Sequence, residues 1–206
     1  MAELPPRTKA YTLDAIVEAE LLRFEPTTRI SGIVAPFYFD IRRAQSYPKQ
    51  FRDIANGFSG MVQNSEVGKS ALLAGIPEAG TPFASILGYN LKRKLVQPRK
   101  TVKEHGKQKS VEGVYETGEK VILIDDVVTK GDSKLAAIKQ VEDAGLSVEE
   151  IIVLIDHEQG GIGTVREAGY NIRAIFGITT LINHLLEVGQ ITPDQRDVAL
   201  EFVRNS

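Results

Sequence analysis

The sequence VILIDDVVTKGDS at residues 121–133 sets the architecture expected for the whole chain. Four branched apolar residues are followed by two adjacent acids, Asp125 and Asp126, and then by a short loop of small and hydroxylated residues. A short apolar run that ends at charged residues is typical of a buried parallel strand. Because ligands usually bind at the carboxyl end of such a strand, we expect a polar site directly after Asp126.

A helix is expected after this loop, over residues 133–144, because Leu135, Ile138, Val141 and Ala144 follow helical spacing. The loop at residues 127–132 then leads into a helix N-terminus, where backbone N–H groups attract phosphate. Residues 150–156, EIIVLID, repeat the pattern of an apolar strand ending in an acid. Strand, helix and strand in this order imply a right-handed crossover. The predicted fold is therefore a doubly wound α/β fold, with a mainly parallel sheet flanked by helices.

The remaining segments fit the same fold. We expect a helix capped by Thr12 that runs through Leu22, and two short strands or an edge ribbon between residues 27 and 40. A second helix should start at Pro48, and residues 71–74 and 171–178 should be strands. Further helices are expected at residues 179–188 and from Thr192 onward. Because the 206 residues contain no internal repeat and no visible linker, a single domain over residues 1–206 is predicted.

Composition argues against several kinds of site. Cysteine is absent, which removes disulfides, thiolate nucleophiles and cysteine-bound metals, and the three histidines have no metal-binding spacing. A bound metal would be a hard cation held by oxygen atoms. No apolar run reaches the roughly 20 residues of a membrane helix. The first residues also lack the apolar segment of a signal peptide, so we expect a cytoplasmic protein.

Residues 92–109 form a strongly basic segment in a chain whose net charge is only −2. Eight lysines and arginines stand against one acid, Glu104, which gives about +7 here and, by difference from −2, about −9 for the remainder. A solvated charged loop is the ordinary interpretation of such a run. The repulsion within it would be relieved by a bound polyanion, and the lack of interleaved aromatic residues favours a small polyphosphate over nucleic acid.

The paired acids suggest a sugar phosphate as the ligand. Asp125 and Asp126 can accept hydrogen bonds from the vicinal hydroxyls of a ribose whose 5-phosphate lies in the loop that follows. Glycoside hydrolysis fits less well, because adjacent residues on a strand point to opposite faces. A pair of turn-forming acids without a ligand is the alternative. The turn at residues 75–82, GIPEAGTP, is likewise either a ligand-binding turn or a plain strand-to-helix connection.

Several motifs together resemble a known family. VILIDDVVTKGDS resembles the phosphoribosyl pyrophosphate signature of the type I phosphoribosyltransferases, and RKTVKEHG at residues 99–106 resembles the mobile catalytic loop of orotate phosphoribosyltransferase. The similarity extends through PFYFDIR at 36–42, GIP at 75–77 and DHEQGG at 156–161. The chain most resembles the phosphoribosyltransferase half of bifunctional uridine monophosphate synthase.

This resemblance implies transfer of a phosphoribosyl group from phosphoribosyl pyrophosphate to orotate, giving orotidine 5'-monophosphate and pyrophosphate in de novo pyrimidine synthesis. It implies Mg²⁺ held mainly by substrate and water, and a homodimer in which each mobile loop closes over its neighbour's site. A decarboxylase partner would complete the synthase. Residues 1 to about 45 would partly form a hood over the base site.

The resemblance also implies roles for individual residues. The implied catalytic residues are Arg99, Lys100, Lys103, His105, Asp125 and Asp126. The residues implied to bind phosphoribosyl pyrophosphate are Glu78, Ala79, Gly80, Asp125, Asp126, Val127, Val128, Thr129, Lys130, Gly131, Asp132 and Ser133. The residues implied to bind the base are Tyr38, Phe39, Thr129 and His157.

Three departures from the family pattern bear on these roles. His157 stands where the family has an arginine that grips orotate, and Ile30, beside Arg29, stands where it has a lysine. Asp132 lies within the phosphate loop, and Ala79 replaces a lysine or hydroxyl residue in the pyrophosphate turn. We expect Asp132 to turn away from the phosphate and cap the helix. Two alternatives stay open: a phosphoribosyltransferase for another base, and a non-catalytic regulator that binds phosphoribosyl pyrophosphate and uses residues 92–109 on nucleic acid.

Overall fold

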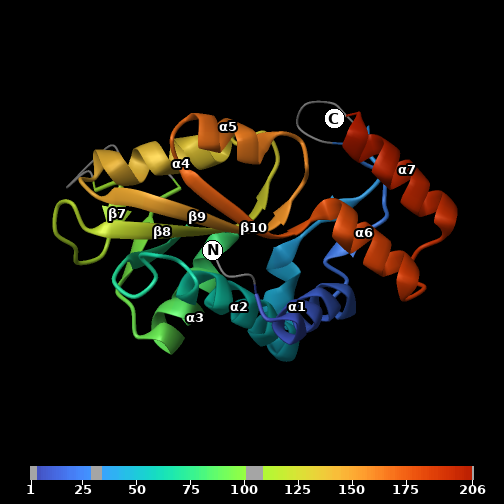
Figure 1. Ribbon diagram of the computed structural model, residues 1–206, viewed down its shortest axis with the longest axis horizontal. Coiled ribbons are helices and arrows are strands. Elements are labelled where there is room, and N and C mark those ends of the chain that lie inside the picture. Colours follow the sequence, from blue (N-terminus) through green and yellow to red (C-terminus); the bar gives the residue numbers. More distant parts are fainter. Residues whose placement is uncertain (1–3, 29–33, 101–108, 206) are drawn as a thin grey trace.

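The computed structural model describes residues 4–28, 34–100 and 109–205 of the chain. A sheet of six strands in the order β10-β9-β8-β5-β6-β7 lies between two layers of helices (Figure 1). Every neighbouring pair is parallel except β6 and β7, which are antiparallel. The strands are β5 (Leu72–Gly75), β6 (Leu95–Pro98), β7 (Val111–Glu112), β8 (Lys120–Val128), β9 (Ser147–Asp156) and β10 (Asn171–Gly177). The predicted doubly wound, mainly parallel fold is confirmed.

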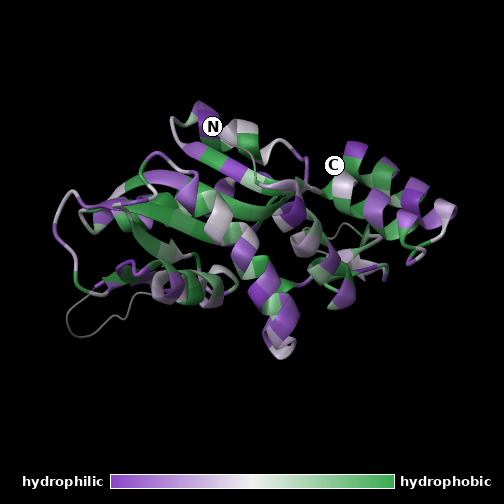
Figure 2. Ribbon diagram, turned by 60° about the horizontal axis from the view of Figure 1, so that its bottom comes forward, coloured by the Kyte–Doolittle hydropathy of each residue, from purple (hydrophilic) through white to green (hydrophobic). Residues whose placement is uncertain are grey.

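Helices cover both faces of this sheet. On one face lie α1 (Pro6–Glu18), α2 (Pro48–Gln63) and α3 (Gly80–Leu91), and on the other α4 (Asp132–Asp143) and α5 (Gly161–Glu167) (Figure 1). The helices α6 (Ile178–Glu187) and α7 (Pro193–Arg204) extend beyond β10. Within β8, Ile122 and Ile124 pack into the core on the first face, and Val121 and Leu123 into the core on the second. Both faces of the strands are therefore apolar. In Figure 2 the ribbons of the central strands accordingly have mostly the hydrophobic colour.

Residues 22–28 and 34–46 form a small region built mainly from two ribbons. Strand β1 (Leu22–Arg23) pairs antiparallel with β4 (Tyr38–Phe39), and β2 (Thr27–Thr28) pairs antiparallel with β3 (Val34–Ala35). A 3-10 helix, η1 (Ile41–Ser46), follows. The expectation of short strands between residues 27 and 40 is confirmed. Tyr38 and Phe39 form β4, in the ribbon with β1.

The predicted first helix, capped by Thr12 and running through Leu22, is wrong at both ends. Helix α1 begins at Pro6 rather than at Thr12 and ends at Glu18, because proline fits the first helical position, where its missing N–H costs nothing. Thr12 is buried inside the helix, and its hydroxyl donates to the carbonyl oxygens of Thr8 at 2.9 Å and Asp53 at 3.2 Å. The second bond ties α1 to α2.

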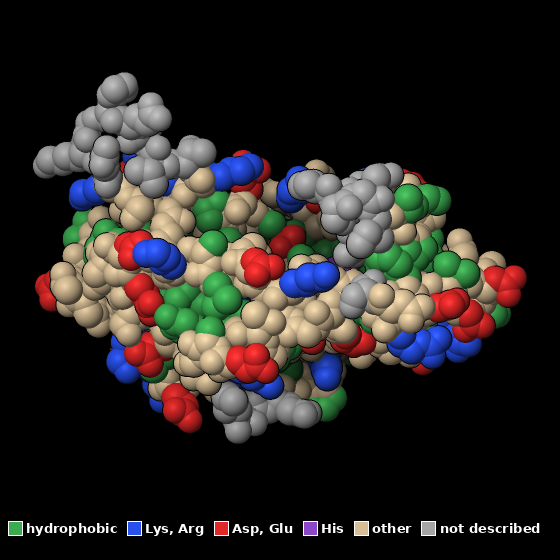
Figure 3. All heavy atoms as spheres, turned by 90° about the horizontal axis from the view of Figure 1, so that it is seen from above, with side chains coloured by type: hydrophobic (Ala, Val, Ile, Leu, Met, Phe, Trp, Pro, Cys, Tyr) green, Lys and Arg blue, Asp and Glu red, His purple; other side chains and the backbone are tan. Residues whose placement is uncertain are grey.

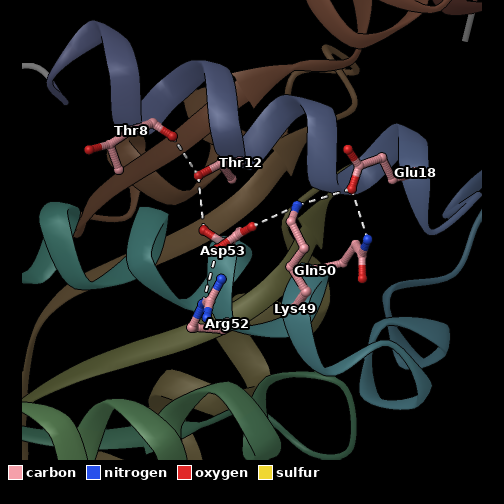
Figure 4. A network of polar contacts seen from close by, with 7 residues as sticks. All are labelled: Thr8, Thr12, Glu18, Lys49, Gln50, Arg52 and Asp53. Carbon is pink, nitrogen blue, oxygen red and sulfur yellow. Dashed lines mark hydrogen bonds and ion pairs between the residues drawn. The ribbon is translucent and has the colours of Figure 1, made fainter.

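Further polar contacts join the same two helices, as Figure 4 shows. The ammonium of Lys49 lies 3.2 Å from a carboxylate oxygen of Glu18 and 3.2 Å from one of Asp53, and Gln50 donates to Glu18 at 2.8 Å. Gly57 on α2 makes room for this packing, because a Cβ there would lie 2.6 Å from the Thr12 hydroxyl oxygen. The N-terminal helix is thus fixed firmly on α2.

The structure differs from the sequence-based expectation in two further segments. Strand β8 does not end at the paired acids but continues to Val128, because Val127 and Val128 still pair with Ile155 and Asp156 of β9. The basic segment is not a loop throughout, because residues 95–98 form β6, with Val96 and Pro98 buried. No helix within the described ranges is long and apolar enough to cross a bilayer.

Candidate functional site

The order of the strands places a crevice at the carboxyl ends of β5 and β8. From β5 the chain passes through α3 to β6 on one side, and later returns to β8 on the other side of β5 before continuing through α4 to β9. Helix α3 accordingly covers one face and α4 the opposite face. Such a switch point is where open α/β sheets bind their ligands. The turn after β5 and the loop after β8, both singled out in the sequence, meet there.

The turn after β5 is pressed against β8. The N–H of Ile76 donates to the carbonyl oxygen of Ile124 at 2.9 Å, and the N–H of Gly80 donates to Ile76 at 3.0 Å. A Cβ on Gly80 would lie 2.0 Å from the Ile124 carbonyl oxygen. Only glycine fits at this position, because the first residue of α3 lies directly on the backbone of the neighbouring strand.

Asp125 and Asp126 point to opposite faces of the sheet, as alternation along a strand requires. Asp125 is buried on the α4 side, where its carboxylate lies 2.5 Å from the ammonium of Lys134. Asp126 is half-buried, accepts a hydrogen bond from the N–H of Val127 at 2.7 Å, and lines an open hollow on the other side. Of the two acids, only Asp126 lines this hollow, and the predicted contact of Asp125 with the ribose stays a prediction.

The environment of Asp125 changes its acidity. Burial raises the pKa of Asp125 to about 7, against the opposing attraction of Lys134. The carboxyl therefore takes up a proton far more readily than an exposed aspartate does. Asp125 is buried from solvent and forms an ion pair with Lys134, as a residue with a structural role does.

The hollow beside Asp126 has a volume of about 230 Å³ and collects residues from three separate segments. Its lining consists of Tyr38, Phe39, Asp40, Arg42, Glu78, Ala79 and Asp126. Two residues predicted to contact a base thus lie together with two from the predicted pyrophosphate turn and one predicted to contact ribose. Tyr38 is partly exposed, whereas Phe39 belongs mainly to the core.

A second hollow, of about 650 Å³, shares Arg42 and Glu78 with the first. Its other lining residues include Arg99 and Lys100 at the end of β6. Lys100 lies 3.2 Å from Glu78 across this hollow. Arg99 forms an ion pair with Glu112, and its carbonyl oxygen accepts from Gln140 at 2.7 Å. The two described basic residues of the RKTVKEHG motif therefore stand beside the turn after β5, whereas Lys103 and His105 lie outside the described residues.

The start of the loop after β8 is held by two backbone hydrogen bonds. Val128 accepts from the N–H of His157 at 2.9 Å, and Thr129 accepts from the N–H of Gly161 at 2.9 Å. The side chain of Val128 is buried, so only its backbone can meet a ligand. Thr129 is half-buried, and Lys130, Asp132 and Ser133 are exposed.

The expected helix cap at Asp132 is wrong. Gly131, with a φ of +96°, caps α4, and Asp132 is its first residue, in a cap without any side-chain hydrogen bond. A left-handed backbone is easy for glycine, so the loop makes its turn there. The exposed Asp132 carboxylate still lies in the first helical turn, where the helix dipole favours negative charge.

His157 occupies a different environment from Tyr38 and Phe39. Its side chain is buried, and its ring centre lies 6.0 Å from that of Phe37. Phe37 in turn packs against Phe24 and Phe202. The structure thus places His157 in an aromatic cluster, whereas Tyr38 and Phe39 line the hollow at Asp126. Ile30 and Arg29, the other positions of concern for base recognition, are outside the described residues.

Two residues at the site were missed by reasoning from the sequence. Arg42 lines both hollows, and its guanidinium bonds Asp40 at 2.6 Å and the Tyr38 hydroxyl at 2.8 Å. Its place in the PFYFDIR motif was the available signal. Lys134 is the buried partner of Asp125. It shares a helical face with Ile138 and Val141, and a lysine on an apolar face beside paired acids was a signal that went unused.

Comparison with known proteins agrees with this arrangement. Residues 45–180 match the phosphoribosyl transferase domain. An orotate phosphoribosyltransferase of Pyrobaculum calidifontis is 33% identical over 174 residues, which cover 84% of this chain and 89% of that protein. The bifunctional enzyme PyrF/PyrE of a Nostoc species is 33% identical over 180 residues, or 87% of this chain. This chain spans only 37% of the length of that relative.

A solved structure has the same fold as this chain although the two sequences are only 28% identical. The UMP synthase of Leishmania donovani superposes with a TM-score of 0.87 at 28% identity, covering 98% of this chain and 43% of that one. The match of the domain spans more than half of the chain and includes the turn after β5, the paired acids and the loop after β8. The chain therefore belongs to the phosphoribosyltransferase family.

Proposed function

We propose that this chain transfers the phosphoribosyl group of phosphoribosyl pyrophosphate to orotate, forming orotidine 5'-monophosphate and pyrophosphate. The observation that carries the proposal is the pair of adjoining hollows. One joins Tyr38 and Phe39 to Asp126, and the other joins the turn at Glu78 to Arg99 and Lys100. A base, a ribose and a pyrophosphate can be arranged along this path in the order that the reaction needs. The relatives named orotate phosphoribosyltransferase support orotate as the acceptor.

The donor would be held by three groups of residues. Asp126 accepts hydrogen bonds from the ribose hydroxyls, while backbone N–H groups of residues 129–133 and the hydroxyls of Thr129 and Ser133 bind the 5-phosphate at the start of α4. The turn at residues 78–80 borders the pyrophosphate.

The basic residues act on the leaving group. As the bond to pyrophosphate breaks, positive charge develops on the ribose ring and negative charge on pyrophosphate. Arg99 and Lys100 stabilise that negative charge, and the motif assigns the same task to Lys103 and His105. Closure of residues 99–106 would keep water from the reactive ring carbon.

The acids at the hollow fit a magnesium ion. Mg²⁺ is usually bound through one or two carboxylates together with substrate phosphates and water. Asp126 and Glu78 offer carboxylate oxygens at the same hollow. When bound with the donor, Mg²⁺ would neutralise charge on the pyrophosphate, while Arg99 and Lys100 orient the leaving group.

Recognition of an acidic base can be assigned to Arg42. The family arginine is replaced by His157, which lies against Phe37. Arg42 places a guanidinium at the hollow beside Tyr38. A planar guanidinium suits the carboxylate of orotate, whereas uracil and the purine bases carry no such group. The same replacement favours a second candidate, transfer to a different base.

Several wider properties follow from the proposed function. Residues 1 to about 45 form part of a hood over the base, a homodimer shares the loop at 99–106 between sites, and the enzyme works in the cytoplasm. A decarboxylase partner is supported by the bifunctional relatives, of which this chain spans 37% and 38%. Acidic and basic side chains are interspersed over the face that carries α4 and α5 (Figure 3), so this face offers no uniformly basic surface for nucleic acid. The regulator hypothesis therefore depends on residues 92–109, where Arg99 pairs with Glu112 and Lys100 with Glu78.

The test is a comparison of acceptors. Purified chain with phosphoribosyl pyrophosphate and Mg²⁺ is given orotate, uracil or a purine base, and pyrophosphate release is followed. We expect release with orotate and none above background with the other bases. Release with another base and none with orotate would show the second candidate to be right. A chain that binds the donor and releases no pyrophosphate with any base would refute enzymatic transfer.

A further inference from the structure

Lys134 is a buried lysine that the proposed reaction does not use. It lies in the first turn of α4, and its side chain is only 5% exposed, beside Asp125 at 6%. The other residues on its face of the helix are apolar, among them Ile138 and Val141. Burying an ion pair is seldom better for stability than burying apolar side chains of the same size. Stability alone therefore gives no reason for a lysine at this position.

The ammonium of Lys134 contacts two side chains. It lies 2.5 Å from a carboxylate oxygen of Asp125 and 3.3 Å from the hydroxyl oxygen of Ser133. An ammonium has three donors and no acceptor. The Ser133 oxygen must therefore accept in this contact, and its own O–H is left to donate elsewhere. Ser133 is exposed at the start of α4.

The same ammonium links the two sides of the loop after β8. Asp125 belongs to the strand and Lys134 to the helix, so their contact closes residues 125–134 into a ring. At the helical end of the ring, the carbonyl oxygen of Gly131 accepts from the N–H groups of Lys134 at 2.9 Å and Leu135 at 3.0 Å. The positive charge is fixed directly behind the loop to which the proposed function assigns the 5-phosphate.

We propose that Lys134 is a positioning residue for the 5-phosphate, with Asp125 as its anchor. Held by Asp125, the ammonium turns the Ser133 hydroxyl so that its proton donates to the phosphate, and it adds a positive charge behind the loop. This role rests on the proposed function, because that function places the phosphate at residues 129–133. It also gives Asp125 a task on the closed side of β8, away from the ribose.

The test measures binding of ribose 5-phosphate by calorimetry, which needs neither orotate nor turnover. Lys134→Met is expected to weaken binding about tenfold, in line with the loss of one hydrogen bond to a charged group. Ser133→Ala is expected to weaken it similarly, and the double variant about as much as the weaker-binding single one, because both changes remove the same contact. Lys139→Met is the matched control, since Lys139 lies on the same helix, pairs with Asp143 and is 75% exposed. It should bind like the wild type.

A kinetic measurement separates positioning from general loosening of the fold. Lys134→Met should raise KM for phosphoribosyl pyrophosphate while leaving KM for orotate unchanged. If Lys134→Met does not fold, Asp125→Asn/Lys134→Met removes both buried charges and is expected to show the same weakened binding of ribose 5-phosphate.

The outcomes distinguish this role from the proposed function. A folded variant without the ammonium that binds ribose 5-phosphate as tightly as the wild type would refute the role of Lys134 alone. Fully additive effects of Lys134→Met and Ser133→Ala would refute the claim that Lys134 acts by orienting the Ser133 hydroxyl. A wild-type chain that does not bind ribose 5-phosphate would refute the phosphate site itself, and with it the role of Lys134.

Discussion

The two faces of β8 use the same residue type in opposite ways. On the α4 face Asp125 is closed off and paired with Lys134, whereas on the α3 face Asp126 opens onto the hollow with Tyr38 and Glu78. The backbone brings both carboxylates to the same end of one strand, and alternation separates them. Neighbouring acids in a motif therefore need not share a ligand. One can hold the loop in place while the other contacts the substrate.

The largest expected effect comes from the open face. Asp126→Asn keeps the size of the side chain but removes the charge that meets the ribose. We expect kcat/KM for phosphoribosyl pyrophosphate to fall about 10²- to 10³-fold, as for other preorganised contacts at a reacting centre. The melting temperature should change little, because Asp126 is half-buried and makes no ion pair among the described residues. If Asp126→Asn lowers kcat/KM less than threefold, Asp126 is not the acid that contacts the substrate.

Replacing Asp125 on the closed face should change the stability of the protein and the dependence of that stability on pH. The pKa of Asp125 is about 7 in the folded chain, against 3.8 for an unperturbed aspartate. The folded state therefore holds this proton more tightly, and the stabilisation is complete below about pH 4 and lost as the pH rises through about 7. Urea unfolding at a series of pH values should show the stability of the wild type falling relative to that of Asp125→Asn as the pH rises between those limits. A difference that stays constant from pH 5 to pH 8 would contradict the assignment.

A smaller effect is expected for the base. Arg42→Gln removes the guanidinium beside Tyr38, and we expect KM for orotate to rise about tenfold, the cost of one charge-assisted hydrogen bond. The KM for phosphoribosyl pyrophosphate should rise less. The matched control is Arg52→Gln on α2, since Arg52 is exposed and bonds only its neighbour Asp53 among the described contacts. An unchanged KM for orotate in Arg42→Gln would remove Arg42 from base recognition.

The smallest effect belongs to the exposed pair on α4. Lys139 and Asp143 are spaced i,i+4 on the helix surface, 2.7 Å apart. Lys139→Met should cost about 0.3 to 0.5 kcal/mol in urea unfolding, and less at high salt. Lys134→Met, which leaves Asp125 buried without its partner, should cost several times more. Equal losses for the two lysines would mean that burial does not distinguish them.

The sheet could be predicted from the sequence because β8 and β9 contain the unbroken apolar runs at residues 121–124 and 151–155. The sequence also brought the correct segments to the site, since the ends of parallel strands must meet at one edge. It placed the first helix too late, because Thr12 resembles a cap while its hydroxyl is in fact satisfied by Asp53 on α2. That contact joins residues 41 positions apart, and no local pattern reveals it.

The details of the site were less accessible for the same reason. Asp132 had the residue type of a helix cap, but the left-handed Gly131 took that place. The pairing of Asp125 with Lys134 depends on which face of the strand meets which face of the helix. Arg42 lines the hollow because residues 38–42 lie beside Glu78 and Asp126, which are distant in the sequence. In each case tertiary packing decided what the side chain contacts.

The most direct measurement is the identity and amount of the product. The wild-type chain is incubated with phosphoribosyl pyrophosphate, Mg²⁺ and orotate, and orotidine 5'-monophosphate is quantified by mass spectrometry beside the pyrophosphate released. The proposed function predicts one nucleotide for each pyrophosphate, with Asp126→Asn nearly inactive and the control Lys139→Met as active as the wild type. Pyrophosphate without the nucleotide, or a nucleotide yield that Asp126→Asn leaves intact, would contradict it.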